Sequence, residues 1–362
     1  MRVLFHHTAE DWSGCSRAFA VAAQGLVGHG ATVTVVCRAD SAAEQAFASQ
    51  GLDVVSVPIT DSVSRDAWRL RTVLKERFIE VVFLHSEREQ LVASSAMRLA
   101  ERGAVIRRIP VGGIVSTGRG ARLAEKMATS RLLFSTPMDL ARADVGDRGL
   151  LAPLGVDVEK ADEMRMTSRG TLGVEPGTQL MVCVADRKAK GRIHTALRTV
   201  ALLAPRHPEL RLALVGSGCD DDDTHMHASA LGVTPLVRFL GERDDMAAVV
   251  GAAEVGWVAA EGDDGAFACL DFMAAGVPVI AERTPVLSHY VPDGIAGVLL
   301  PPAHPNDTAA TVANFLADNN TRVAMGKAGR TRVVRDFPES AMIEGYIAAA
   351  KAAGDRALWA AR

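Results

Sequence analysis

Cysteine, aromatic residues and long apolar runs are all scarce in this chain of 362 residues. The five cysteines are scattered and none belongs to a CxxC pair, which argues against a zinc site or a disulfide framework and indicates a reducing compartment. Aromatic residues make up 5% of the chain, so base stacking on nucleic acid is not its expected function. No apolar run approaches the ~20 residues that span a membrane, and the first residues do not resemble a signal peptide. We therefore expect a soluble, cytoplasmic protein that binds no nucleic acid.

Hydrophobic residues (48%) and charged residues (23%) occur in the proportions of an ordinary globular protein. The length predicts two domains or three. Residues 1–150 hold 19 Lys+Arg and 16 Asp+Glu (net +3), which leaves 21 and 27 (net −6) for residues 151–362. This difference is too small to imply DNA binding, but it indicates two parts with different partners.

Short apolar strands alternate with amphipathic helices, which predicts an α/β fold with parallel sheets and right-handed crossovers. In the first half we expect strands over residues 2–6, 31–37, 53–57, 80–85, 104–109 and 132–135, and helices over 17–28, 64–76, 89–102 and 118–130. The pattern breaks at residues 153–157 (PLGVD), where we place a hinge. It resumes with strands over 179–184, 210–215, 237–240, 255–260, 277–281 and 298–300, and helices over 193–204, 224–231, 245–253, 306–318, 320–335 and 338–362. The sequence thus predicts two doubly wound domains. Because such sheets bind ligands at the carboxyl ends of their strands, we expect a cleft where the two sheets face each other.

The stretch over residues 257–282 contains the strongest candidate site. We expect an acidic loop over residues 261–265, followed by a helix that ends near Gly276. The start of such a helix presents free backbone N–H groups and the positive end of its dipole to a phosphate. Asp263 and Asp271 flank this site and would repel a phosphate, so we expect them to accept hydrogen bonds from the hydroxyls of a ribose or a sugar. A helix cap and a solvated carboxylate are the alternative.

A basic cluster follows the first strand of the second half and comprises Arg187, Lys188, Lys190 and Arg192. Cations in fixed geometry at this sheet edge could stabilise a diphosphate leaving group without Mg²⁺, whereas a solvated basic turn is the alternative. The strand and GxG over residues 214–218 lack the rest of a dinucleotide fingerprint, so a tight turn is the simpler interpretation. The acidic run over residues 220–223 is explained by helix capping better than by a metal site.

Three features of the first half are candidates for ligand contacts. Gly14, in the turn over residues 13–17 (SGCSR), permits a close approach of the backbone to a ligand. His85 ends a strand and could donate to a sugar hydroxyl, although a structural histidine is equally consistent. Basic residues that would suit an acidic acceptor or an anionic membrane surface are Arg107, Arg108, Arg119, Arg122 and Lys126. An ordinary solvated face remains the simpler interpretation of that group.

The stretch over residues 257–282 resembles the signature of glycosyltransferase family 4, retaining nucleotide-sugar-dependent enzymes of the GT-B fold. Asp263 matches the first acid of that signature, residues 265–267 (GAF) its glycine-rich loop, Asp271 its second acid, and residues 273–281 (MAAGVPVIA) its end. Lys190 with Gly191 matches the family's Lys-Gly, and Arg187 stands for its upstream Arg. Further similar segments occur in order over residues 13–17, 153–157, 214–218, 237–241, 293–294 and 336–346, so the resemblance covers most of the chain.

The resemblance implies two Rossmann-like doubly wound domains that face each other across a cleft: an acceptor-side domain over residues 1–155 and a nucleotide-sugar domain over 156–337. It also implies a final helix over 338–362 that crosses back to the first domain. The implied donor-binding residues are Gly14, Arg17, Arg187, Lys190, Gly216, Arg243, Asp263, Gly265, Ala266, Phe267, Ala268 and Asp271. The backbone N–H groups around Ala266 to Ala268 would help to bind the diphosphate, Asp271 would bind the ribose, and the turn after Gly241 would bind the base. The catalytic candidates are Asp263, Arg187, Lys190 and His85, with no metal.

The chain also departs from the family pattern. Both signature acids are Asp where Glu is usual, and Asp264 replaces a loop glycine. Residues 110–112 (PVG) occupy the place of a frequent family histidine. We therefore expect a retaining, metal-independent, hexosyltransferase-like enzyme that uses a UDP- or GDP-type sugar donor and a glycan, lipid or small-molecule acceptor. Peripheral membrane contact through the basic first domain is a further expectation. The alternatives are a non-catalytic relative that binds a nucleotide sugar or a partner protein, and another GT-B activity such as a sugar-nucleotide epimerase.

Overall fold

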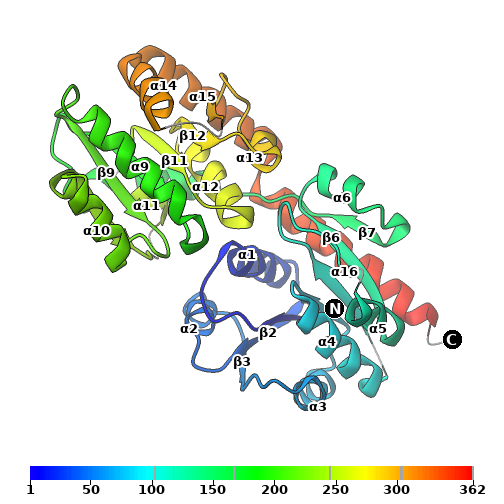
Figure 1. Cartoon of the computed structure of the whole chain (residues 1–362). Coiled ribbons are helices and arrows are strands. Elements are labelled where there is room, and N and C mark those ends of the chain that lie inside the picture. Colours follow the sequence, from blue (N-terminus) through cyan, green and yellow to red (C-terminus); the bar gives the residue numbers. More distant parts are fainter. Residues whose placement is uncertain (102, 117, 166–167, 244–245, 302–304, 361–362) are drawn as a thin grey trace. The chain divides into compact units, whose positions relative to one another are not determined.

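The computed structural model describes residues 1–362 apart from 102, 117, 166–167, 244–245, 302–304 and 361–362 (Figure 1). The chain divides into two compact units. Unit 1 contains Met1–Leu154 and Glu339–Arg362, and unit 2 contains Gly155–Pro338. None of the described helices has the length and apolar character needed to cross a membrane.

Unit 1 is built on a seven-stranded parallel sheet with the order β3-β2-β1-β4-β5-β6-β7. Its strands are β1 Arg2–His7, β2 Thr32–Arg38, β3 Val54–Val57, β4 Val81–Leu84, β5 Ala104–Arg108, β6 Thr129–Phe134 and β7 Gly149–Leu151. Its helices are α1 Gly14–Gly28, α2 Ala42–Ser49, α3 Val63–Glu76, α4 Glu87–Ala100, α5 Arg119–Met127, α6 Pro137–Ala143, η1 Gly146–Arg148 and α16 Glu339–Ala360. The chain reverses its direction across the sheet between β1 and β4, and ligands of doubly wound folds bind at such a point.

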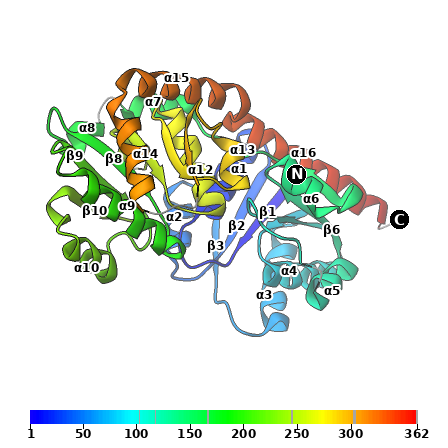
Figure 2. The ribbon, with the colours of Figure 1, turned by 45° about the horizontal axis from the view of Figure 1, so that its top comes forward.

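Alternate residues of the central strands cover the two faces of this sheet. Leu4 of β1 packs in one apolar cluster with side chains of α3 and α4. The next residue, Phe5, points to the opposite face, where its ring lies 5.1 Å from Phe19 of α1 and 6.3 Å from Tyr346 of α16. In Figure 2, α16 runs along the sheet of unit 1, and it contacts α1, β5 and β6. Both faces of the sheet are therefore covered, and the strands β1, β2, β4 and β5 are almost completely buried, whereas the edge strands β3 and β7 are partly exposed.

Unit 2 is built on a six-stranded parallel sheet with the order β10-β9-β8-β11-β12-β13. Its strands are β8 Gln179–Val184, β9 Leu210–Val215, β10 Val237–Gly241, β11 Val255–Val258, β12 Val279–Glu282 and β13 Gly297–Leu300. Its helices are α7 Val158–Arg165, α8 Ser168–Thr171, η2 Arg187–Ala189, α9 Lys190–Leu203, α10 Asp222–Ala230, η3 Thr234–Leu236, α11 Met246–Gly251, α12 Gly262–Ala274, α13 Pro285–Tyr290, α14 Pro305–Ala317 and α15 Asn319–Asp336. The two parallel sheets confirm the predicted α/β class.

Helix α12 lies directly against β11 because that strand contains a glycine. A Cβ atom on Gly256 would lie 2.4 Å from the ring of Phe272, so any other residue would push the helix away. The neighbouring residues of β11, Val255 and Trp257, point to the other face and join the main apolar cluster of the unit. This packing fixes α12, and with it the start of that helix at the carboxyl edge of the sheet.

Several predicted boundaries were wrong. Helix α1 begins at Gly14 rather than at residue 17, and α12 begins at Gly262 rather than after Gly265. The polar and acidic residues at these positions predict a loop, but such residues are also favourable in the first turn of a helix. The helix expected over residues 118–130 ends at Met127, because Thr129 already pairs with Ala104 in the sheet. Helices α2, α6 and α13 and strand β7 were not predicted, since they are too short for a clear period.

Candidate functional site

The loop after β8 contacts the loops after β9 and β11 at the carboxyl edge of the unit 2 sheet, where these three strands are neighbours. The backbone N–H of Arg187, after β8, donates to Ser217 Oγ in the turn after β9 (3.1 Å). The carboxylate of Asp186 accepts a hydrogen bond from the backbone N–H of Glu261, the residue before α12 (3.0 Å). The structure therefore brings the basic segment and the start of α12 to one place within unit 2.

Gly216 allows the turn after β9 to lie this close to the loop after β8. Its φ of +114° is in the region that only glycine adopts readily, and a Cβ atom would lie 2.0 Å from the carbonyl oxygen of Ala185. Gly218 lies beside Arg187 in the same way, since its Cβ would be 3.1 Å from the Arg187 Cα. The GxG sequence therefore serves to pack two loops together at the candidate site.

Arg192 braces the site and is not placed to be a free phosphate ligand, contrary to the grouping made from sequence. Its Nε lies 2.5 Å from Glu282 Oε2 at the end of β12, and its Nη1 lies 2.6 Å from Glu261 Oε1. Burial acts to lower the pKa of Arg192, but its hydrogen bonds with Glu282 and Glu261 outweigh this and raise it. The sequence prediction missed these contacts because Glu261, before α12, and Glu282, at the end of β12, are far from α9 along the chain.

Lys190, at the first position of α9, is held by two carboxylates. Its Nζ lies 3.3 Å from Asp221 Oδ2 and 3.4 Å from Asp223 Oδ2. Hydrogen bonding with Asp221 and the charge of that carboxylate raise the pKa of Lys190, so the side chain remains cationic. Asp221 also caps α10 by accepting from the Thr224 N–H (2.9 Å), which confirms the capping interpretation of the acidic run. Because exposed ion pairs contribute at most about 1 kcal/mol, a phosphate could compete for this lysine.

The first turn of α12 contains the predicted Asp263, which is buried (4% exposed). Gly265 is also buried, and a Cβ atom on it would lie 2.4 Å from the carbonyl oxygen of Ala260. Its N–H donates to the carbonyl of Glu261 (3.1 Å), so the helical hydrogen bonds have already begun there. The N–H groups of an α-helix that lack helical partners are those of its first turn, here residues 262–264.

The predicted role of the amides around Ala266 to Ala268 is therefore wrong. These residues and Phe267 between them are buried inside α12, where each N–H bonds to the carbonyl four residues earlier. Asp271 lies on the same helix and is half-buried. Eight residues of helix separate it from Asp263 by about 12 Å along the axis, so the two acids would meet different parts of a ligand. Arg243 is exposed in the segment that follows β10.

The predicted site residues of unit 1 lie at the carboxyl edge of its own sheet. Gly14 is the buried first residue of α1, and Arg17 is half-buried in the following turn. His85 directly follows β4, and its side chain is 16% exposed. Glu89, which contacts His85, was missed. The spacing Ser86-x-x-Glu89 indicates a helix cap, but nothing local in the sequence shows its partners on other elements.

Arg107 and Arg108 do not belong to a basic surface, contrary to the sequence interpretation. They are 7% and 1% exposed, because the end of β5 is enclosed by neighbouring elements. Arg108 donates to Ser135 Oγ (3.1 Å), and Arg107 donates to Gln90 Oε1 (3.2 Å). The exposed basic residues of this region are Arg119, Arg122 and Lys126 on α5.

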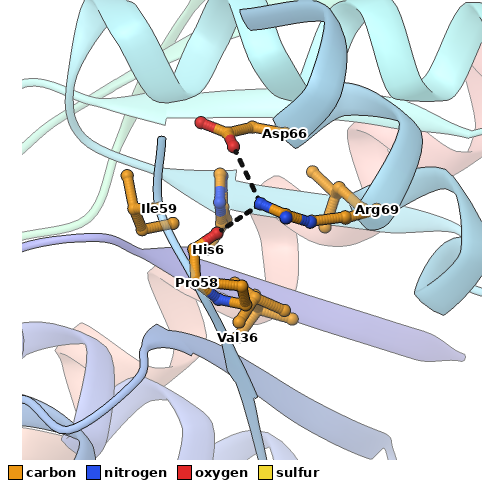
Figure 3. A pocket seen from close by; sticks show the side chains of 8 residues that line it. His6, Val36, Pro58, Ile59, Asp66 and Arg69 are labelled. Atoms are coloured by element: carbon orange, nitrogen blue, oxygen red, sulfur yellow. Dashed lines mark hydrogen bonds and ion pairs between the residues drawn. The ribbon is translucent and has the colours of Figure 1, made fainter. Parts of the chain in front are cut away.

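A small pocket in unit 1 contains none of the predicted site residues. It lies between the strands β1 to β3 and helix α3, beside His6 and Val36 (Figure 3). Arg69 crosses it, with Nη1 2.9 Å from the carbonyl oxygen of Pro58 and 3.6 Å from Asp66 Oδ1. In the described part of the chain, no three His, Cys, Asp or Glu side chains form a group that could hold a metal ion.

The second half of the chain is similar in sequence to known glycosyltransferases. Residues 165–332 match the family model "Glycosyl transferases group 1". The chain is 30% identical over 190 residues to a D-inositol 3-phosphate glycosyltransferase of Corynebacterium jeikeium, covering 49% of this chain and 45% of that protein. It is 27% identical over 277 residues to the protein of the same name from Corynebacterium kroppenstedtii, covering 73% of this chain and 58% of that one. The chain thus spans about half the length of these relatives.

Similarity in structure extends over the whole chain. The crystal structure of Anabaena HepE in complex with UDP and glucose matches with a TM-score of 0.78 at 17% identity, covering 96% of this chain and 98% of that one. At this level of identity the likeness establishes the fold. The chain therefore has the GT-B fold of two Rossmann-like domains, and residues 165–332 within it match the group 1 glycosyl transferases.

Proposed function

We propose that this protein is a glycosyltransferase that moves a sugar from a nucleoside diphosphate donor of the UDP or GDP type to an acceptor hydroxyl, with retention of the anomeric configuration and without a metal ion. The observation that carries the proposal is the joining of three loops at the carboxyl edge of the unit 2 sheet, around the start of α12. The match of residues 165–332 to the group 1 family model and the fold shared with a UDP-bound protein support it.

In this proposal the donor diphosphate binds to unit 2. The N–H groups of the first turn of α12 lie at the positive end of the helix dipole, and Arg187 and Lys190 add full charges nearby. Charge-assisted hydrogen bonds of this kind contribute about 1.5–3 kcal/mol each, and they strengthen as negative charge develops on the leaving diphosphate. Lys190 would exchange Asp221 and Asp223 for the phosphate.

The roles proposed for the carboxylates follow from their burial. Asp263 is buried in the first turn of α12 and would accept hydrogen bonds from hydroxyls of the donor sugar. Asp271 would do the same for the ribose. The acceptor would bind to unit 1, where His85 would contact its hydroxyl. A small phosphorylated polyol is the first acceptor to try, because two relatives carry D-inositol 3-phosphate in their names.

A ligand screen followed by product analysis tests the proposal. Thermal unfolding with UDP-, GDP- and ADP-sugars should show one stabilising class, since a ligand at about 100 times its Kd adds about 2.7 kcal/mol. The stabilising donor is then incubated with D-inositol 3-phosphate and other polyols, and the anomeric configuration of the product is read by proton NMR. We expect transfer with retention that persists in EDTA. An inverted product, or activity that EDTA abolishes, would contradict the mechanism.

The departures from the family signature motivate a second candidate, a non-catalytic relative that binds a nucleotide sugar. The pairing of Lys190 with Asp221 and Asp223 also favours it, because these acids compete with a diphosphate. Nucleotide binding without transfer or hydrolysis would support this candidate. Conversion of the labelled donor to a different sugar nucleotide would instead indicate an epimerase.

A further inference from the structure

Unit 1 contains a buried carboxylate, Glu89, at the point where its sheet changes direction. The residue is 1% exposed and lies in the first turn of α4, which follows β4. Strand β4 pairs with β1, and the chain moves away in opposite directions from these two strands. Ligands of doubly wound sheets bind at the carboxyl ends of such a strand pair. A glutamate is almost never fully buried unless it is paired, so its partners indicate its function.

Glu89 joins the ends of both strands through hydrogen bonds. Its Oε1 accepts from the backbone N–H and the hydroxyl of Thr8, the residue after β1 (2.7 and 2.8 Å). Its Oε2 accepts from the backbone N–H groups of His85 and Ser86, which follow β4 (3.1 and 2.9 Å). A helix cap requires only the bond from Ser86. The remaining bonds fix the position of the carboxylate relative to the imidazole of His85.

Three imidazoles surround this carboxylate, and only one of them reaches solvent. His6 and His7 are 3% and 0% exposed, and burial lowers the pKa of each, to about 3 for His7. Burial acts to raise the pKa of Glu89, but His85 and the other nearby groups outweigh it and hold that pKa well below its usual range. Glu89 is therefore an anion, and His85 Nδ1 lies 3.3 Å from its Oε2, an ion-pair distance whose geometry falls short of a hydrogen bond. Among the described residues this buried Nδ1 has no hydrogen-bond partner, so the Glu89 carboxylate is the group placed to attract a proton to it. Other charged groups near His85 are Arg107, which donates to its carbonyl (3.4 Å), and Glu87, which pairs with Arg107.

The ring of His85 is also held by its packing. Its centroid lies 4.9 Å from the ring of His7 and 5.7 Å from that of Phe19. The Nε2 of His7 lies 2.9 Å from Ser16 Oγ in the first turn of α1, which keeps His7 in place. With the ring packed on two sides and Nδ1 beside a carboxylate, the tautomer with a proton on Nδ1 is the favoured neutral form.

We propose that Glu89 is a positioning residue that acts through His85. Its negative charge, 3.3 Å from Nδ1, favours a proton on that nitrogen, leaves Nε2 without a proton, and so presents Nε2 to accept a hydrogen bond from the hydroxyl of a sugar or polyol acceptor. This inference rests on the proposed transferase function, and it names a group that orients the acceptor rather than the donor.

A double-mutant cycle separates this role from a purely structural one. The variants are Glu89→Gln, His85→Asn and their combination, and the assay is transfer from the active donor of the screen to D-inositol 3-phosphate or to the best polyol. Asn retains a donor near the position of Nδ1 but has no Nε2. We expect Glu89→Gln to lower kcat/KM for the acceptor about 10- to 100-fold, as for carboxylates that orient metal-bound imidazoles. In the His85→Asn variant, Glu89→Gln should lower kcat/KM for the acceptor by less than about twofold, because the imidazole through which Glu89 acts is gone.

Two controls accompany the cycle. Ser86→Ala removes the other half of the same helix cap and should leave the acceptor dependence of the rate unchanged. The Kd for UDP should be the same in Glu89→Gln and in the unaltered protein, since the donor site is in unit 2. Equal losses from Glu89→Gln in both backgrounds would overturn the proposal.

The tautomer of His85 provides a test that needs no turnover and leaves Glu89 unchanged. In the full chain labelled with ¹⁵N-histidine, with His85 assigned by its loss in His85→Asn, we expect the neutral ring to have Nδ1 protonated and Nε2 unprotonated. A proton on Nε2 would overturn the inference even if transfer is observed. If no donor is bound or turned over, the proposed function fails, and the tautomer alone decides whether Glu89 orients His85.

Discussion

His7 should make unit 1 lose stability in mildly acidic solution. This side chain is 0% exposed, and burial together with the charge of His85 lowers its pKa from 6.5 to about 3. Below pH 6.5 the unfolded chain therefore binds a proton that the folded unit excludes. The free energy of unfolding must fall as the pH decreases through this range, by up to about 1.4 kcal/mol per pH unit. Integrated from pH 6.5 to pH 5.0, the contribution of this one group is about 1.6 kcal/mol.

The perturbation is His7→Gln, because a glutamine does not titrate and its amide can still reach Ser16 Oγ. The free energy of unfolding of unit 1 is measured in urea at several pH values between 7.5 and 5.0. Hydrogen exchange of the β1 amides reports the unfolding of this unit. A local probe is needed because a chain with two units need not unfold in one transition. This pH range lies above the pKa of ordinary carboxyl groups, so protonation of carboxylates contributes little to the difference.

We expect the variant to have a smaller pH dependence than the unaltered protein, whatever its stability at pH 7.5. The difference between the two curves should grow by about 1.6 kcal/mol from pH 6.5 to pH 5.0. His29→Gln removes an exposed imidazole from the same unit and should give the curve of the unaltered protein. Parallel curves for His7→Gln and the unaltered protein would refute the conclusion that His7 is buried in its neutral form.

Three further predictions concern the candidate site in unit 2, the packing of its loops and a buried carboxylate of unit 1. Lys190→Ala should abolish transfer and weaken UDP binding while the melting temperature stays the same; full activity in this variant would exclude the proposed role of the lysine. Gly216→Ala should destabilise unit 2 by about 1–3 kcal/mol, because the new Cβ would lie 2.0 Å from the Ala185 carbonyl oxygen. The control is Gly191→Ala in α9, where no other atom lies within 4 Å of the new Cβ. This substitution should stabilise unit 2 by about 0.5–1 kcal/mol, and urea unfolding gives the free energies of unfolding of both variants. Asp66→Asn should cost about 1–3 kcal/mol in the same assay, since this buried carboxylate accepts several hydrogen bonds, and a loss below about 0.5 kcal/mol would contradict this.

Much of the fold could be predicted from the sequence because buried parallel strands are continuous apolar runs. The strand over residues 179–184 was predicted with the bounds that β8 has, and the break near residue 155 lies where the two units divide. The two acids that match the family signature, Asp263 and Asp271, also lie on one helix, since they are close along the chain. The pattern of residues within short segments was sufficient to predict these features.

The partners of the site residues could not be predicted, because they depend on which strands become neighbours. Lys190 pairs with Asp221, which follows β9, and Arg192 reaches Glu282 at the end of β12. Arg108 belongs to a run of basic residues, yet its position at the end of β5 buries it. Each of these outcomes follows from the order of strands across a sheet, which no short segment encodes.

For Glu89, the local sequence predicts one role and the tertiary structure adds another. Its sequence neighbourhood determined that it would cap α4, since Ser86 lies three positions earlier. Only the pairing of β1 with β4 brought Thr8, 81 residues away along the chain, to the same carboxylate and made that carboxylate a link between two strand ends. The amino-acid sequence by itself determined the strands, the helices and the kinds of side chain at their ends. The tertiary structure decided which of those side chains meet, because hydrogen bonds and ion pairs act over a few ångströms in space regardless of separation along the chain.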